Sequence, residues 1–278
     1  MGVIVLNTNL RNKIAGAIYG FAIGDAMGAT TEFMDAKQIK LKYGKVKDII
    51  GGGWLSLRPG EITDDTQMTM CVMSAIMRQP ENVNDFKKFC TNNFIIWLNS
   101  NPKDIGGQCF KSIHGLKHGI ATKYDSQALG NGSLMRAMPL AVLNLPYFNI
   151  AQGEITHNNK VCSSTILIYT DLLQRYLNGE YNNLYTKNIK CLLEPSGYIK
   201  NSFNNSIYWS KKDSFEEAII GAVNHGGDAD TIAAITGSLA GAKFGYDAIP
   251  ERWINQLNPD VKEFLEKFKN FTFSCLQI

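Results

Sequence analysis

Hydrophobic positions recur at helical spacing along most of the chain, whereas the alternation typical of strands is rare. Over residues 10–27 they include Ile14, Ile18 and Phe21, which fall three or four positions apart. Residues 66–77 and 232–244 are apolar almost all round, which is typical of helices buried inside a helical protein. The pattern predicts an all-α fold with these three helices as core neighbours. Further helices are predicted over 83–98, 105–119, 133–144, 159–177, 202–209, 214–223 and 259–268.

Glycines repeat along the first predicted helix in a way that requires a packing explanation. Gly16, Gly20, Gly24 and Gly28 fall four residues apart. A glycine inside a helix costs about 1 kcal/mol relative to alanine, so a whole face of them predicts a neighbouring helix that approaches very closely. The segment 43–61 breaks the helical pattern with glycines and a proline, and is therefore predicted to be a loop.

Composition limits the class of protein. The chain has 278 residues, of which 45% are hydrophobic and 19% charged, and it contains no linker-like segment, so we expect many orthogonally packed helices in one compact domain over 1–278. A net charge of +3 is too small to predict a nucleic-acid partner. The six cysteines form no C-x-x-C pair, so the sequence predicts neither a zinc site nor a disulfide framework. This pattern is typical of proteins in a reducing cytoplasm. The apolar run 14–24 is too short for a membrane span. We expect a cytoplasmic monomer.

Two acidic segments have the same design. In "EITDDTQMTM" (61–70) and "GGDADTIAAI" (226–235), two aspartates and a threonine precede or begin a strongly apolar helix. Helix capping is the simplest interpretation, because Asp and Thr are preferred N-cap residues and favour the positive end of the helix dipole. Each cap, however, needs only one such residue.

A metal site is the alternative interpretation of these segments. Two carboxylates about 4 Å apart repel by about 4 kcal/mol at an intermediate dielectric, and a divalent cation between them removes that cost. The ligands available are hard oxygens without Cys or His, which suits Mg²⁺, Mn²⁺ or Ca²⁺ rather than zinc. Aspartates from two segments would also allow two ions to share a carboxylate, as in two-metal hydrolases.

Motifs along nearly the whole chain give a family resemblance. They are "GAIYGFAIGDAMGATTEF" (16–33), "GGGWLSLRPGEITDDTQM" (51–68), "PKDIG" (102–106), "GNGSLMRAMPLAV" (130–142), "THNN" (156–159), "SGYIKNSF" (196–203) and "DSFEEAIIGAVNHGGDADTIAAITGSLAGAKFG" (213–245). Each motif alone is weakly specific, but their order along the chain resembles that of the ADP-ribosylglycohydrolase family, and most closely the branch acting on arginine-linked ADP-ribose.

The resemblance implies an all-α fold with a cleft holding two Mg²⁺ or Mn²⁺ ions. It also implies an ADP-ribosylated protein as substrate and ADP-ribose as product. Asp104 and Glu32 would be the candidate acid/base residues, although an isolated Asp after Pro-Lys is most often an N-cap and an isolated Glu a surface residue. The metal-binding residues implied are Thr63, Asp64, Asp65, Asp228, Asp230 and Thr231.

Further residues are candidates for binding the substrate. "GNGS" offers backbone N–H groups before a predicted helix, which is a common way to bind a pyrophosphate, although a Gly-Asn-Gly alone is more often just a turn. The resemblance adds a histidine near the nucleotide, and a tyrosine could stack on adenine, although either could be a structural residue. These candidates are Gly130, Asn131, Gly132, Ser133, His157 and Tyr198.

Three functions remain open from the sequence. The first is hydrolysis of the N-glycosidic bond to arginine. The second is hydrolysis of another ADP-ribose linkage, such as a serine-linked one or O-acetyl-ADP-ribose. The third is an inactive, crystallin-like protein that binds ADP-ribose, which the intact aspartates disfavour.

Overall fold

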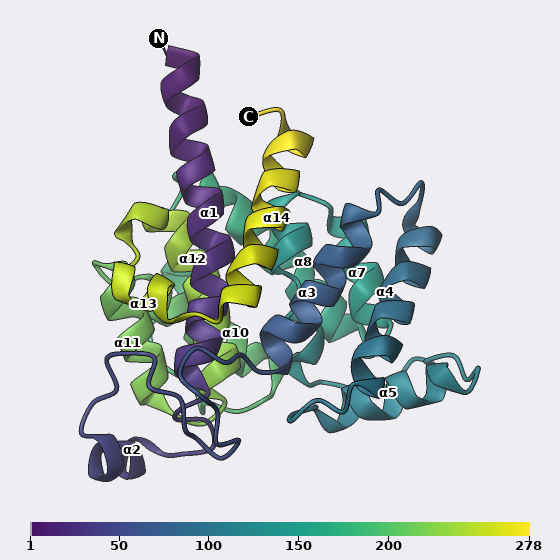
Figure 1. Cartoon of the computed structure of the whole chain (residues 1–278), viewed down its shortest axis with the longest axis horizontal. Coiled ribbons are helices and arrows are strands. Elements are labelled where there is room, and N and C mark those ends of the chain that lie inside the picture. Colours follow the sequence, from purple (N-terminus) through teal and green to yellow (C-terminus); the bar gives the residue numbers. More distant parts are fainter. Residues whose placement is uncertain (1) are drawn as a thin grey trace.

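The computed structural model describes residues 2–278 and confirms the all-α prediction (Figure 1). No β-strand occurs among these residues. Their only β-type backbone pairing is two isolated bridges. The helices are α1 (Gly2–Gly28), α2 (Ala36–Tyr43), α3 (Asp64–Met77), α4 (Val83–Asn99), α5 (Gly107–Lys117), η1 (Asn131–Ser133), α6 (Met138–Val142), α7 (Pro146–Glu154), α8 (Lys160–Leu177), α9 (Leu184–Asn188), α10 (Ile199–Ser210), α11 (Phe215–His225), α12 (Ala229–Phe244), η2 (Tyr246–Ala248), α13 (Glu251–Gln256) and α14 (Pro259–Leu276).

Helices α1 and α12 run side by side through the centre of the molecule (Figure 1). Their glycines face each other, as the four-residue repeat predicted. A Cβ built on Gly20 would lie 2.3 Å from the carbonyl oxygen of Gly237, and one built on Gly16 would lie 2.4 Å from that of Gly241. No side chain fits into such a gap. The two backbones therefore touch directly, and this contact fixes how far one helix can slide along the other.

Several helices pack directly on this pair, whereas α4, α5 and α7 pack on helices farther out. Helices α10 and α11 pack against α12, while α3 contacts α1, α12 and α4. Within the described residues every side chain from Ile232 to Ala242 is buried, as its apolar pattern predicted. No helix in this range combines the length and hydropathy that crossing a bilayer requires.

One predicted helix is wrong, and several were not predicted. The range 133–144 is divided between the end of η1 and the short helix α6, with irregular turns between them. Pro139 lies within this range, and a proline is tolerated in the first turn of a helix but not in its interior. Helices α2, α7, α9 and α13 were not predicted, and all four are shorter than ten residues, so their hydrophobic repeat is weak.

Candidate active site

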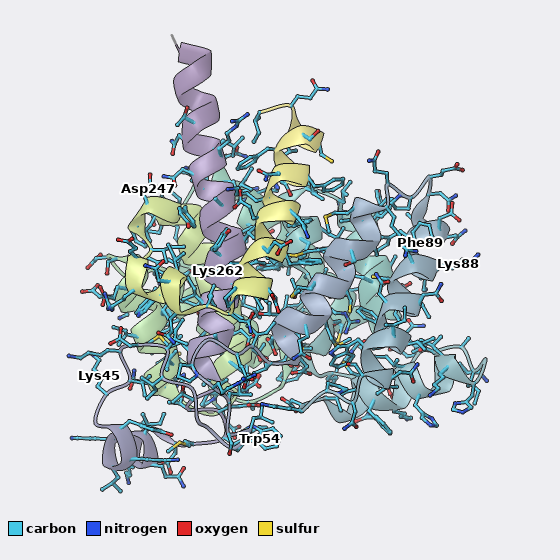
Figure 2. All side chains as sticks on the ribbon, viewed as in Figure 1. Lys45, Trp54, Lys88, Phe89, Asp247 and Lys262 are labelled. Atoms are coloured by element: carbon cyan, nitrogen blue, oxygen red, sulfur yellow. The ribbon has the colours of Figure 1, made fainter. Side chains whose placement is uncertain are left out.

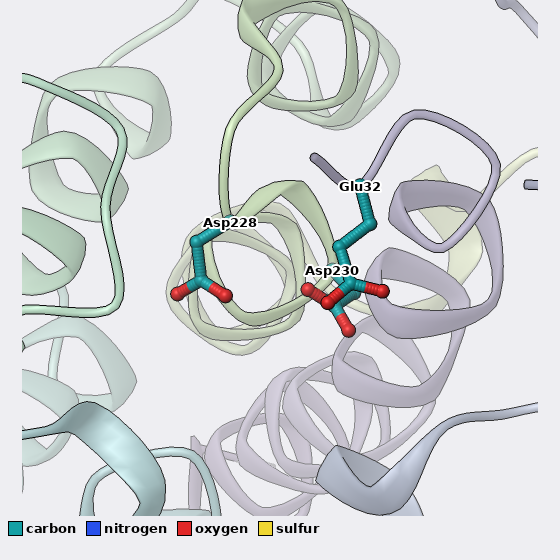
Figure 3. A group of neighbouring side chains, drawn as sticks. All are labelled: Glu32, Asp228 and Asp230. Atoms are coloured by element: carbon teal, nitrogen blue, oxygen red, sulfur yellow. The ribbon is translucent and has the colours of Figure 1, made fainter. Parts of the chain in front are cut away.

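The two acidic segments meet in the folded chain. Asp64 and Asp65 begin α3, Asp228 and Asp230 lie at the start of α12, and Glu32 follows the end of α1. Ligand oxygens of Glu32, Asp228 and Asp230 lie within 4.8 Å of one another, as do those of Asp64, Asp65 and Asp230. Figure 3 shows the first of these groups, with Glu32 on the turn after α1 and Asp228 and Asp230 on the segment that begins α12. Asp230 belongs to both groups.

Capping does not account for these carboxylates. Thr63 is the N-cap of α3 and its hydroxyl accepts the backbone N–H of Asp65, so α3 is capped without either aspartate. Asp228 occupies the N-cap position of α12 without a side-chain capping bond. The Oδ1 atom of Asp65 is buried and, among residues 2–278, has no hydrogen-bond partner. A buried carboxylate oxygen without a partner, on a residue grouped with two other aspartates, fits a hard divalent cation.

Burial and mutual repulsion shift the pKa values of these groups. Burial is the main cause that raises the pKa of Asp64, Asp65 and Asp230 well above the usual range, and neighbouring carboxylates add to it. Burial also raises the pKa of Glu32 to about 8 and that of Asp228 to about 6. Without a cation the cluster therefore favours protons, and a cation would compete with those protons for the same oxygens.

A pH dependence of stability follows. A raised pKa in the folded state stabilises it fully below the ordinary carboxylate pKa, and this contribution is lost as pH rises through about 6 for Asp228 and about 8 for Glu32. We expect the melting temperature of the metal-free protein to fall from pH 5 to pH 8. We also expect added Mg²⁺ to raise the melting temperature more at pH 8 than at pH 5. Thermal unfolding with and without EDTA measures both, and an increase that is equal at the two pH values would contradict the cation site.

Asp25 supports the cluster but was not a predicted site residue. It is fully buried, and its carboxylate accepts the Thr63 hydroxyl at 2.8 Å and the backbone N–H of Thr66 at 3.0 Å. It therefore ties the end of α1 to the start of α3. The signal that could have revealed it is an aspartate ending an otherwise apolar helical run, since such a carboxylate needs hydrogen-bond donors from elsewhere in the fold.

The acidic residues line a cleft of about 260 Å³ that also contains the predicted glycine loop. Gly130, Asn131, Gly132 and His157 lie along it. A Cβ on Gly132 would lie 2.8 Å from the His157 ring, so the loop is packed tightly on that histidine. Burial lowers the pKa of His157 to about 3, and the ring is therefore neutral at pH 7. The cleft therefore has a neutral histidine and a tightly packed glycine loop at one end and a cluster of carboxyl groups at the other.

Asn131 and Arg136 hold the loop in place. The amide of Asn131 donates to the Asp228 carboxylate and, at 2.9 Å, to the hydroxyl of Ser202. Arg136 is fully buried behind the loop, where it donates to the carbonyl of Gly132 at 2.7 Å and to the Thr156 hydroxyl at 2.7 Å. Arg136 was not predicted as a site residue. A charged residue within the apolar stretch that follows the glycines was the available signal, because a buried guanidinium must be hydrogen-bonded.

The remaining predicted site residues differ in whether they line the cleft. Asp104 lines the cleft and is not an N-cap, since Gly106 occupies that position in α5. Glu32 is buried with 5% of its surface exposed, so its interpretation as a surface residue is wrong. Thr231 lines the cleft and donates to Asp65 at 3.2 Å. Thr63, Ser133 and Tyr198 do not line it; Ser133 is fully buried, and Tyr198 is part-exposed at the bridge to Gly130.

Four backbone segments form a row along the cleft. The N–H of Phe33 bonds to the carbonyl of Gly227, and that of Asp228 bonds to the carbonyl of Pro195. The N–H of Asn131 then bonds to the carbonyl of Gly197. Gly227 has φ +66, and a Cβ there would lie 1.9 Å from the Pro195 oxygen, so only glycine fits. The turn after α1 and the glycine loop are thus opposite ends of the row, with the acidic segment 226–228 between them.

Comparison with known proteins identifies the family. A family model described as ADP-ribosylglycohydrolase matches residues 6–273. The chain belongs to the ADP-ribosylglycohydrolase family. The resemblance of its motifs, the all-α fold and the enzyme class expected from them are thereby confirmed at the level of the family.

Relatives of this ADP-ribosylglycohydrolase are similar over most of their length. The chain is 34% identical to the ADP-ribosyl-[dinitrogen reductase] glycohydrolase of Rhodospirillum rubrum, covering 93% of this chain and 95% of that protein. It is 28% identical to the ADP-ribosylarginine hydrolase Tri1 of Pseudomonas putida, covering 88% and 74%. A solved structure titled ADP-ribosylglycohydrolase-related protein complex has a TM-score of 0.80 at 24% identity, covering 97% of this chain and 99% of that one, which is a likeness of fold.

Proposed function

We propose that this ADP-ribosylglycohydrolase removes ADP-ribose from arginine side chains of modified proteins. The observation that carries the proposal is that two carboxylate groups sharing Asp230 line the same cleft as the glycine loop and His157. The names of the relatives from Rhodospirillum rubrum and Pseudomonas putida describe a glycohydrolase of an ADP-ribosylated protein and an ADP-ribosylarginine hydrolase, and both support this substrate class.

The carboxylate groups are proposed to hold two Mg²⁺ or Mn²⁺ ions. Asp64, Asp65 and Asp230 would hold one ion, and Glu32, Asp228 and Asp230 the other. Thr231, whose hydroxyl lies in the cleft, would complete the first set, while Thr63 would act through its cap on α3. When bound, such ions would lower the pKa of a water and so supply the nucleophile.

The chain's own residues would then bind the substrate and move the proton. The backbone of Gly130–Gly132 and the side chain of His157 would hold the pyrophosphate side of ADP-ribose, with Ser133 supporting the loop from behind and Tyr198 at its outer edge. Breaking the bond from ribose C1″ to the guanidinium nitrogen requires a proton at that nitrogen. Asp104 and Glu32 both line the cleft, and burial raises the pKa of each. Either carboxyl would supply that proton, Glu32 only while it does not bind an ion.

A product assay across linkages tests the proposal. Metal is first removed from the protein with a chelator. The protein is then incubated with arginine-linked ADP-ribose, serine-linked ADP-ribose or O-acetyl-ADP-ribose, with and without Mn²⁺ or Mg²⁺, and the free ADP-ribose released is quantified. We expect release from the arginine-linked substrate only when a metal is present. Release only from another linkage would replace the proposed substrate. Tight binding of ADP-ribose without turnover of any substrate would identify a binding protein instead.

A further inference from the structure

Two aromatic side chains project from the turn and loop beside Glu32. Phe33 is 66% exposed and lines the cleft, and Trp54 is 51% exposed. Their ring centroids lie 5.3 Å apart. Figure 2 shows Trp54 at the edge of the molecule where the loop before α3 passes the end of α1. Adjacent aromatic rings that are left exposed at the mouth of a site offer a surface for a ligand.

The backbone holds this aromatic pair rigidly. Phe33 has φ +61, an uncommon conformation for a residue other than glycine, and its N–H is fixed to Gly227 at 2.7 Å. The loop that carries Trp54 is closed by paired hydrogen bonds between Gly52 and Leu57. A Cβ on Gly53 would lie 2.2 Å from the Ala29 carbonyl oxygen, so the loop packs directly on the turn after α1. The backbone that carries the two rings is therefore preorganised.

The chemistry around the pair is suited to a planar cation. The indole N–H of Trp54 donates to Glu32 Oε2 at 2.6 Å, which places a carboxylate at the ring edge. None of the cation–ring contacts among residues 2–278 involves Phe33 or Trp54, so their faces are not taken by a Lys or Arg of this chain. Aromatic faces attract guanidinium groups, and a nearby carboxylate strengthens that attraction.

Position along the row of backbone segments indicates which part of a substrate reaches the pair. Phe33 lies at one end, the Gly130–Gly132 loop at the other, and the acidic segment between them. A substrate whose pyrophosphate lies on the glycine loop and whose ribose lies at the carboxylates must direct its protein-linked end toward Phe33 and Trp54.

We infer that Phe33, Trp54 and Glu32 form a subsite for the guanidinium of the modified arginine, and that this subsite gives the enzyme its preference for arginine linkage. The inference rests on the proposed function, since it assumes that ADP-ribose occupies the glycine loop. Trp54 and Phe33 bind the leaving side chain and take no part in proton transfer.

Steady-state kinetics of single variants test the subsite. Trp54→Leu and Phe33→Leu each remove one aromatic face while keeping apolar bulk, and each should raise KM for arginine-linked ADP-ribose by about 3- to 30-fold. The dissociation constant of free ADP-ribose, measured by calorimetry, should stay within about twofold because ADP-ribose has no guanidinium. Trp54→Phe keeps a ring face but loses the bond to Glu32, so its KM should rise less than that of Trp54→Leu. Tyr147→Leu removes an exposed aromatic that lines no part of the cleft and is the matched control.

A binding measurement separates failure of this inference from failure of the proposed function. Agmatine, which carries a guanidinium on a short chain, is added to the wild-type protein saturated with ADP-ribose and Mg²⁺, and its binding is followed by saturation-transfer NMR. Binding that Trp54→Leu weakens supports the subsite even if no arginine-linked substrate is hydrolysed. Agmatine signals equal in wild type and Trp54→Leu, or an equal loss of affinity for ADP-ribose and the arginine-linked substrate, would overturn it.

Discussion

Replacing Asp230 by Asn should lower kcat/KM for the ADP-ribosylated substrate by about a thousandfold or more, because metal ions contribute several kcal/mol to transition-state stabilisation and Asp230 belongs to both cation groups. No other residue is shared by the two groups. The measurement is steady-state release of ADP-ribose with saturating Mn²⁺. Asp247→Asn, which changes an exposed aspartate on η2, is the matched control and should leave the rate unchanged.

The same substitution should have opposite effects on activity and on metal-free stability. Burial raises the pKa of Asp230, and repulsion from Glu32, Asp228 and other neighbouring carboxylates adds to the shift. A neutral amide removes both the cost of burying the charge and the repulsion. The metal-free Asp230→Asn protein should therefore melt at a higher temperature than metal-free wild type at pH 8. Its melting temperature should respond little to added Mg²⁺. A variant that keeps activity, or one that is stabilised by Mg²⁺ as much as wild type, would show that the cations bind elsewhere.

Replacing Gly20 by Ala should destabilise the protein by about 3 kcal/mol, because overpacking of a tight core costs about 1–3 kcal/mol and here the new methyl group meets rigid backbone. Its Cβ would lie 2.3 Å from the Gly237 carbonyl oxygen and 3.0 Å from the ring of Phe215. The backbones of α1 and α12 would have to separate. Urea denaturation of the metal-free protein measures the loss.

A matched glycine in another helix should respond in the opposite direction. Gly115 lies inside α5, where a Cβ would find no atom closer than 3.5 Å. Gly115→Ala should stabilise the protein by up to about 1 kcal/mol through helix propensity alone. If Gly20→Ala were as stable as Gly115→Ala, the contact between α1 and α12 would be looser than described above.

The sequence predicted the parts of this site that depend on local chemistry. Apolar residues all round 232–244 predicted a buried helix, and surplus aspartates at the starts of two such helices left a shared cation site as an alternative to helix capping. Both inferences need only the cost of burying charge and of exposing apolar surface. The glycine repeat similarly predicted a close helix pair, because no other arrangement compensates for its low helix propensity.

Features that depend on contacts between distant segments could not be predicted. The immediate neighbours of Asp104 predicted a helix cap, and only the family resemblance indicated a site residue there, because the fold is what brings it into the cleft. The same holds for Asp25, whose partners lie about forty residues away at Thr63 and Thr66. Ser133 shares a motif with Gly130, yet the tight η1 turn directs it away from the cleft lining. Local propensity contains no information about such pairings.

The backbone contact between α1 and α12 also bears on how such an enzyme can evolve. It brings the ends of these helices, which carry Asp25 on one side and Asp228 and Asp230 on the other, to a fixed separation without help from variable side chains. Substitutions elsewhere in the core and insertions in surface loops can then accumulate without moving the acidic residues apart. The glycine contact restricts only a few positions. Relatives that are only 34% and 28% identical over most of this chain are compatible with such a constraint. Sequence drift is therefore expected to be slow at the glycines and fast around them.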